Sequence, residues 1–145
     1  MFNSIYNIAA SAMSSNRLRV NTISSNLANA ETTRTAEGGP YKRRDVVMVA
    51  TDVKQNGFAS VLDQASLKGV KIAGVKVDDS APRQVYDPAH PDADLKTGIV
   101  EMPNVNPVTE MVNLMSASAA YKAAAEIVQV TKQMGQSLMR LSQRF

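Results

Sequence analysis

The chain has no cysteine, no tryptophan and a single histidine. The absence of cysteine excludes disulfides, thiolate catalysis and cysteine-ligated metals. Aromatic residues make up only 5% of the 145 residues, so the burial that large rings supply in a compact core must come from Met, Val, Ile, Leu and Ala. Such a composition favours close helix–helix packing over a thick globular interior.

Long hydrophobic runs are also missing. No stretch approaches the roughly 20 apolar residues of a membrane-spanning helix, and the first residues lack the basic region and apolar run of a Sec signal peptide. We therefore expect no integral membrane segment and, if the protein leaves the cytoplasm, a route other than Sec. The net charge of +3 is too small to indicate a nucleic-acid partner. The one basic run, Lys42-Arg43-Arg44, is read as the solvated start of a strand, with a phosphate contact as the alternative.

The first 30 residues have the spacing of a long helix that packs against partner helices. Separations of four and three residues alternate along the series, which is the a/d pattern of a coiled coil. The series is Phe2, Tyr6, Ala9, Met13, Asn16, Val20, Ile23, Leu27 and Ala30. Asn16, its one polar member, is either a tolerated edge residue or a selector of register and partner. Because Ser and Asn on the other faces lower helix propensity, we expect this helix to need a partner.

A second series of the same kind predicts a helix over residues 107–143. Asn106 and Pro107 form its start signal, since Asn caps a helix and Pro fits the first helical position. The seam is Ala117, Ala120, Ala124, Ile127, Thr131, Met134, Leu138, Leu141 and Phe145. An earlier stripe on a shifted phase is Val108, Val112, Met115 and Ala119. The shift is either a coiled-coil stutter or a way for one helix to serve two neighbours.

Between the helices, residues 38–103 have strand chemistry. Glu37-Gly38-Gly39-Pro40 marks the break, and strands are predicted over 45–50, 70–77, 83–86 and 99–100. Below about 80 residues such a core is marginal on its own. The predicted fold is therefore α+β and helix-dominated, with long N- and C-terminal helices in a coiled-coil-like assembly domain (1–36 and 104–145) and a small β-rich middle region (37–103).

Candidate chemistry is confined to one segment around the only histidine. Asp87, His90, Asp92 and Asp94 could bind a metal. The alternative is turn chemistry, in which two prolines hold the segment extended and Asp side chains bond nearby amides. The sequence contains no G-x-S-x-G, P-loop or G-x-G-x-x-G motif. We expect no enzyme activity, no catalytic residues, no cofactor and no bound metal.

Several segments resemble flagellar proteins. Ser24-Ser25-Asn26-Leu27-Ala28-Asn29-Ala30-Glu31-Thr32 resembles the N-terminal signature of flagellar rod and hook proteins. Residues 87–94 (Asp-Pro-Ala-His-Pro-Asp-Ala-Asp) and 102–112 (Met-Pro-Asn-Val-Asn-Pro-Val-Thr-Glu-Met-Val) are similar to the proximal rod protein family of the FlgC type. Residues 34–41 and Lys132-Gln133-Met134 fit as well, so the resemblance covers nearly the whole chain. One departure is Ile99, where an aromatic residue is expected after the glycine.

The resemblance implies a structural subunit of the proximal rod of the bacterial flagellar basal body. Such a subunit polymerises through its terminal helices with other rod proteins and copies of itself, and forms the hollow drive shaft that spans the periplasm. It implies export by the flagellar type III apparatus, without a cleaved signal peptide. Two other classes stay open on the residues alone: a cytoplasmic coiled-coil adaptor protein, and a small metal-dependent hydrolase using Asp87, His90 and Asp92.

Two sets of residues follow as candidate sites. The expected assembly interface consists of Tyr6, Met13, Asn16, Val20, Ile23, Leu27, Val112, Met115, Ala120, Ala124, Ile127, Met134, Leu138 and Leu141. The expected family-motif loop consists of Asp87, Pro88, His90, Pro91, Asp92, Asp94, Pro103, Asn104 and Asn106. We expect a neighbouring helix to cover Leu138 and Leu141.

Overall fold

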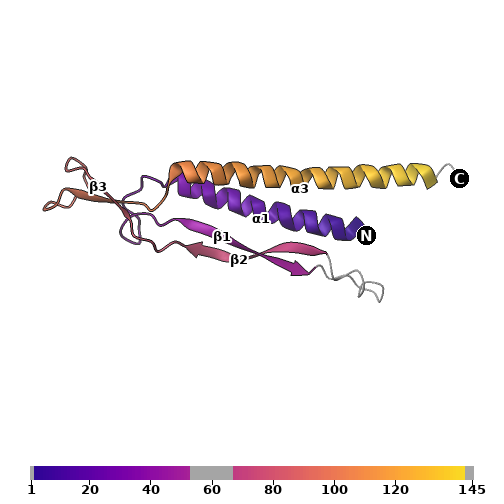
Figure 1. Ribbon diagram of the computed structural model, residues 1–145, viewed down its shortest axis with the longest axis horizontal. Coiled ribbons are helices and arrows are strands. Elements are labelled where there is room, and N and C mark those ends of the chain that lie inside the picture. The colour runs from indigo at the N-terminus through magenta and orange to yellow at the C-terminus, as the bar shows by residue number, and fades with distance from the viewer. Residues whose placement is uncertain (1, 53–66, 143–145) are drawn as a thin grey trace. The chain divides into compact units, whose positions relative to one another are not determined.

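A computed structural model describes residues 2–52 and 67–142, with side chains over 4–52 and 67–140. The elements follow in the order α1 (Phe2–Ala28), β1 (Arg44–Asp52), β2 (Lys68–Val77), β3 (Arg83–Tyr86), β4 (Ile99–Met102) and α3 (Pro107–Ser142) (Figure 1). This confirms the predicted class, a helix-dominated α+β chain with a long helix toward each end and small sheets between them.

The ends of the two helices follow from local hydrogen bonding. Helix α1 stops at Ala28 rather than at residue 30, because the next bonds, from Ala30 N–H to Leu27 O and from Thr32 N–H to Asn29 O, are the tighter three-residue kind. Helix α3 begins at Pro107, as predicted. The Asn106 Oδ1 accepts the N–H groups of Val108 and Thr109, at 3.0 and 3.3 Å, and so caps the helix.

The four strands form two separate two-stranded sheets, β1–β2 and β3–β4. Strands β3 and β4 are antiparallel, with Arg83 opposite Met102 and Tyr86 opposite Ile99. Strand β4 is therefore two residues longer than predicted, because each of its residues pairs with one in β3. In Figure 1 the arrows of β1 and β2 point in opposite directions.

The chain divides into two compact units, and segments of both helices belong to each. The first unit takes in the described residues of 1–18, 48–73 and 117–145, and the second takes in residues 19–47 and 74–116. The second unit has a small apolar core formed by Ala30, Tyr41 and Val105. No helix among the described residues is long and apolar enough to cross a membrane.

The first unit buries mainly small side chains. Ala9 and Ser15 of α1 are buried, as are Ala117, Ala124 and Thr131 of α3. Small residues let helix backbones approach closely, because the distance between helix axes depends on the side chains at the contact. Thr131 satisfies its hydroxyl by donating to Ile127 O at 2.7 Å. A bond from Val70 N–H to Ser11 Oγ, at 3.2 Å, ties β2 to α1.

Candidate functional site

The predicted seam of α1 is largely covered by the chain itself. Ile23 is buried, and Tyr6, Met13, Asn16, Val20 and Leu27 are half-buried. The Asn16 amide donates to Ala12 O, one turn earlier in its own helix, at 2.9 Å. This bond fits a tolerated edge residue. The role of these residues in contacts between subunits stays a prediction.

The predicted seam of α3 is split into two faces. Residues seven apart turn inward: Glu110, Ala117, Ala124 and Thr131 are all buried. Ala120, Ile127 and Met134, which alternate with the buried residues along the seam, are exposed. Leu138 is exposed as well, although it lies seven residues after Thr131. The predicted seam therefore contains a buried set of residues, which packs within the chain, and an exposed set, which is available to another molecule. Leu141 lies in α3, but its side chain is outside the described part, and Phe145 lies outside the described residues.

The outward residues belong to a longer exposed apolar surface, which we call the open stripe of α3. Its members retain between 48% and 72% of their accessible surface. They are Val108, Met111, Val112, Met115, Ile127, Val130, Met134 and Leu138. Exposed large apolar side chains gathered along one helix mark an interaction site. The predicted early stripe and the exposed residues of the predicted seam both contribute to it.

A buried polar cluster in the second unit joins α1, the start of β1 and α3. Its centre is Asn26, which has no solvent-exposed surface. The Asn26 amide nitrogen donates to Arg44 O at 2.7 Å and to Glu110 Oε2 at 3.0 Å. The Asn26 carbonyl oxygen accepts from Arg44 N–H and from the Tyr41 hydroxyl, each at 3.0 Å. Asn26 thus makes all four hydrogen bonds of which its amide is capable.

The same cluster contains an ion pair. Arg43 Nε donates to Glu110 Oε1 at 2.9 Å, and only 1% of the Glu110 side chain is exposed. Burial lowers the pKa of Arg43, but the hydrogen bond to Glu110 and the charges of Glu110 and Asp45 outweigh it and leave this pKa above its ordinary value. Among the described residues no buried side-chain nitrogen or oxygen lacks a partner. We call Asn26, Tyr41, Arg43, Arg44 and Glu110 the Asn26 cluster.

Part of the expected family-motif loop supports this cluster. Asn104 Oδ1 accepts the N–H of Arg43 at 2.8 Å, and the Asn104 amide donates to Asp78 O at 3.0 Å and to Ser80 Oγ at 2.9 Å. Pro103 beside it is buried. With Asn106 as the helix cap, this segment fixes where α3 begins relative to β1 and to the turn after β2.

The segment around His90 forms turns rather than the extended chain that its two prolines suggested. Pro88 and Pro91 lie within these turns. The Asp87 carboxylate accepts the N–H of Ala89 at 3.1 Å, and the His90 N–H bonds to Asp87 O at 3.2 Å. His90 Nδ1 in turn accepts the N–H of Asp92 at 3.1 Å. The expected bonding of Asp side chains to nearby amides is confirmed, whereas the expected extended backbone is wrong.

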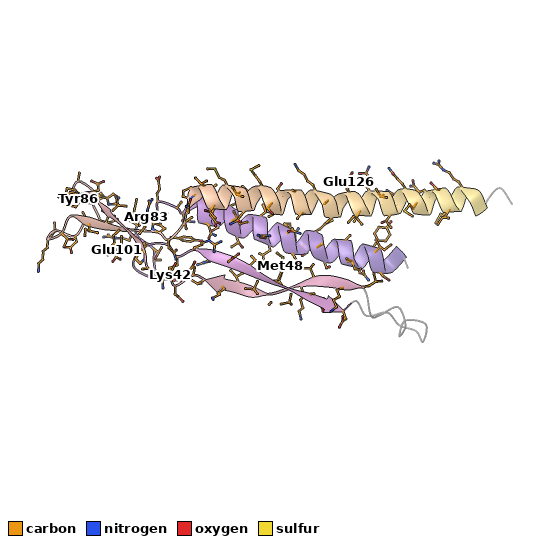
Figure 2. All side chains as sticks on the ribbon, viewed as in Figure 1. Lys42, Met48, Arg83, Tyr86, Glu101 and Glu126 are labelled. Atoms are coloured by element: carbon orange, nitrogen blue, oxygen red, sulfur yellow. The ribbon has the colours of Figure 1, made fainter. Side chains whose placement is uncertain are left out.

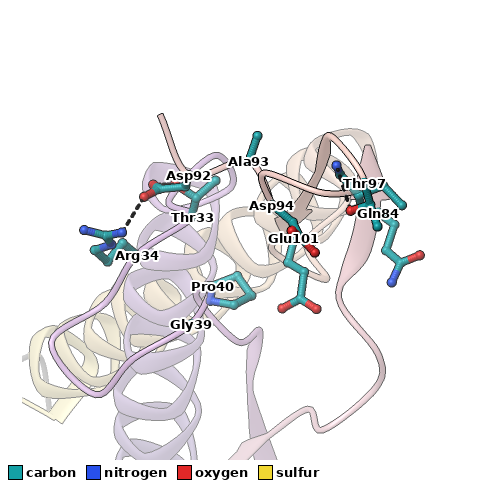
Figure 3. A pocket seen from close by; sticks show the side chains of 11 residues that line it. Thr33, Arg34, Gly39, Pro40, Gln84, Asp92, Ala93, Asp94, Thr97 and Glu101 are labelled. Carbon is teal, nitrogen blue, oxygen red and sulfur yellow. Dashed lines mark hydrogen bonds and ion pairs between the residues drawn. The ribbon is translucent and has the colours of Figure 1, made fainter. Parts of the chain in front are cut away.

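Asp92 and Asp94 also bond to protein atoms. Asp92 pairs with Arg34 NH2 at 2.8 Å and accepts the Thr33 hydroxyl at 2.8 Å (Figure 3). Asp94 accepts the N–H of Lys96 at 2.9 Å. No group of three His, Asp or Glu side chains is arranged to hold a metal in the part of the chain that the structure describes.

A cavity with a volume of about 510 Å³ lies beside this segment. Figure 3 shows the Arg34–Asp92 pair at its edge, with Asp94 and Glu101 also among the lining residues. The described lining residues include no serine, cysteine, lysine or histidine. Because Asp92 bonds both Thr33 and Arg34, these side chains join residues 33–34 to the segment around His90.

Two family models match the ends of the chain. The model described as "Flagella basal body rod protein" matches residues 7–34, which include most of α1 and Asn26. The model described as "Flagellar basal body rod FlgEFG protein C-terminal" matches residues 96–141, which include β4, Glu110 and most of α3. The two matches define the class: a rod protein of the flagellar basal body.

Similar proteins narrow the class to one family. The flagellar basal-body rod protein FlgC of Borreliella burgdorferi is 39% identical over 150 residues, covering 99% of this chain and 98% of the relative. FlgC of Bacillus subtilis is 39% identical over 88% of this chain and 89% of the relative, and FlgC of Salmonella typhimurium is 38% identical over 96% of each. The chain belongs to the FlgC family of flagellar basal-body rod proteins.

Family membership gives the chain its function and place. It is a structural subunit of the rod of the flagellar basal body, not an enzyme. In the sequence, Asn26 and Glu110 were recognised only as members of two separate family motifs, and no contact between them was predicted. Tyr41 and Arg43 were not predicted as site residues. The sequence feature that could have indicated the Asn26 cluster is that both motifs place polar residues beside predicted helix ends.

Proposed function

We propose that the chain polymerises through its terminal helices, with other rod proteins and with copies of itself, to form the hollow drive shaft of the proximal rod. The observation that carries this proposal is the open stripe of α3. Its eight apolar side chains remain about half exposed or more, although the inward face of the same helix is packed with small residues. A helix that served only its own chain would not need an apolar outward face.

The open stripe has two parts that face different directions. At 3.6 residues per turn, Val108, Val112 and Met115 lie close to one line along the helix. Ile127, Met134 and Leu138 lie along a second line, displaced by roughly a quarter of a turn. We infer that the two parts contact two different neighbouring helices in a coiled-coil-like assembly. This agrees with one of the two interpretations of the phase shift, in which one helix serves two neighbours. The other interpretation is a coiled-coil stutter.

We also propose that subunits reach the rod through the flagellar type III export apparatus in a largely unfolded form. The buried faces of the first unit consist mainly of Ala, Ser and Thr. Such side chains contribute little burial to offset the ordering entropy of about 1–2 kcal/mol per backbone residue. Marginal order before assembly suits passage through a narrow channel, and contact with neighbours along the open stripe then stabilises both helices.

The test of assembly is a charge placed in the open stripe. Leu138→Asp should block rod assembly and motility, because a carboxylate buried in an apolar contact is strongly unfavourable without a partner. Gln136→Asp is the matched control: it adds the same charge two residues away at another exposed position of α3, and rods should form. Electron microscopy of basal bodies, with immunoblots for chain level, gives the readout. Normal rods and swimming in cells carrying Leu138→Asp would overturn the proposal.

A further inference from the structure

The loop between β3 and β4 is closed by backbone hydrogen bonds, yet it presents apolar side chains to solvent. Bonds from Gly98 N–H to Asp94 O (2.7 Å) and from Asp94 N–H to Ile99 O (3.0 Å) close it, in addition to the Asp87 and His90 turns. Leu95 is nevertheless fully exposed, and the Tyr86 ring is 74% exposed. Figure 2 shows Tyr86 on strand β3. An ordered apolar surface loses little entropy when it binds, so this loop is preorganised for a partner.

The exposed residues border one hollow. Tyr86, Pro88 and Leu95 all line a cavity of about 330 Å³, and we call these three residues the loop patch. Gly98 supports the patch: its φ is +66°, and a Cβ there would lie 2.9 Å from a carbon of the Tyr86 ring. The ring therefore lies directly over the glycine backbone. Aromatic side chains in such settings dominate binding energy at interfaces.

Acidic groups surround the loop patch. Asp87, Asp94 and Glu101 are exposed, and Lys96 is the one exposed cation among residues 86–102. Glu101 lies opposite Gln84 in the β3–β4 pairing, so it shares a face of the hairpin with Tyr86, two residues further along. The partner that fits this surface has both apolar and positively charged side chains.

Strand β2 of the same chain offers such a surface. The strand Lys68–Val77 contains three lysines and no acidic residue. Alternate residues share one face of a strand, and on one face of β2 Lys71, Ala73, Val75 and Val77 are all exposed. We call these four residues the outer face of β2. It combines a cation with exposed valines. The cation complements the acidic groups around the loop patch, and the valines complement its apolar side chains.

We propose that the loop patch of one copy docks on the outer face of β2 of a second copy. The two surfaces differ, so the contact is heterologous, and its repetition generates a ring or an open helical array. The inference rests on the proposed polymer of rod subunits and adds a second contact to the one made by the open stripe. Since the hairpin and β2 lie outside the terminal helices, this contact would order copies independently of the helices.

The test uses the absence of natural cysteine. A chain carrying Leu95→Cys with Ala73→Cys is expressed in place of the native chain, and isolated basal bodies are oxidised and run on a non-reducing gel. We expect a ladder of dimers and larger species, and none from either single variant. The matched control pairs Leu95→Cys with Glu126→Cys, an exposed position on α3 (Figure 2), and should give no ladder.

Charge reversal adds a second measurement. In the double-cysteine chain, Glu101→Lys should lower the ladder yield about two- to fivefold, the size expected for one exposed charge pair, and adding Lys71→Glu should restore it. A disulfide within one chain, a band joined to a different rod protein, or a yield equal to the control would each overturn the proposal. If the proposed assembly through the open stripe were wrong, Leu138→Asp would leave rods and swimming unchanged whatever the ladder shows, which is a distinct result.

Discussion

Replacing Glu110 by alanine tests whether the Asn26 cluster holds the second unit together. The change removes the carboxylate that accepts from Asn26 and Arg43, at 3.0 and 2.9 Å. It leaves one amide hydrogen of Asn26 without its partner in a site that has no solvent exposure. It also leaves the Arg43 guanidinium with Asp45, 3.5 Å away, as its one ion-pair partner among the described residues.

The magnitude follows from the burial of the pair. Breaking a buried ion pair by removing one partner costs about 3–5 kcal/mol. The Arg43 side chain is 22% exposed and keeps Asp45, so water and a second carboxylate offset part of this cost. We therefore expect Glu110→Ala to lower the free energy of unfolding by about 2–3 kcal/mol.

A neighbouring pair provides the matched control. Lys42 Nζ lies 2.8 Å from Asp79 Oδ1, but the two side chains are 60% and 79% exposed. Exposed pairs of this kind contribute little to stability, because water and salt screen them, so Asp79→Ala should be nearly silent. The two pairs begin at consecutive residues and have similar lengths, and they differ mainly in burial. Urea unfolding of the purified chain, followed by circular dichroism, compares the two variants directly.

A double variant separates loss of the cluster from loss of charge balance. Arg43→Leu combined with Glu110→Leu leaves no lone buried charge, so it should be less destabilised than Glu110→Ala alone. If Glu110→Ala fell within about 0.5 kcal/mol of Asp79→Ala, the size of an ordinary surface change, the structural role assigned to the cluster would be refuted.

Three further measurements test other parts of the structure. Gly98→Ala should cost about 1–3 kcal/mol, because the left-handed backbone disfavours a side chain and the methyl meets the Tyr86 ring; an unchanged urea midpoint would contradict this. The pKa of Asp78 lies below the ordinary value of 3.8, chiefly because the backbone and then the side chain of Ser80 bond to it. Its contribution to stability is therefore present above pH 3.8 and lost as the pH falls through the lowered pKa. The free energies of unfolding of Asp78→Asn and of the native chain should therefore converge in acid. A difference between them that stayed constant with pH would contradict this dependence on Asp78. In a dilute monomer, amides in the outer halves of both terminal helices should exchange rapidly, and those beside the Asn26 cluster more slowly; uniform protection along both helices would show that they close on their own chain.

Local signals in the sequence were sufficient to predict the helices and their limits. The alternation of threes and fours predicted α1 to within two residues, and Asn106-Pro107 predicted the start of α3 because a cap acts over a single turn. The strands were found where valine and isoleucine cluster, with ends adjusted by pairing. The backbone of the loop around His90 was predicted wrongly, because the turns formed by Asp87 and His90 override the extended preference of the residues before each proline.

Two features of the molecule depended on tertiary structure. In the C-terminal seam, Ala117 and Ala120 have the same side chain and both belong to the a/d series, yet only Ala117 is buried. Periodicity defines an apolar face, whereas the neighbouring elements decide which half of it is covered. The Asn26 cluster is the second case: its central bond joins residues 84 positions apart.

The sequence by itself determined the helices, the small strands and the family, because these depend on local spacing and motifs. Only the tertiary structure decided that Asn26 meets Glu110 and that the open stripe remains exposed, since both depend on which distant segments are brought together.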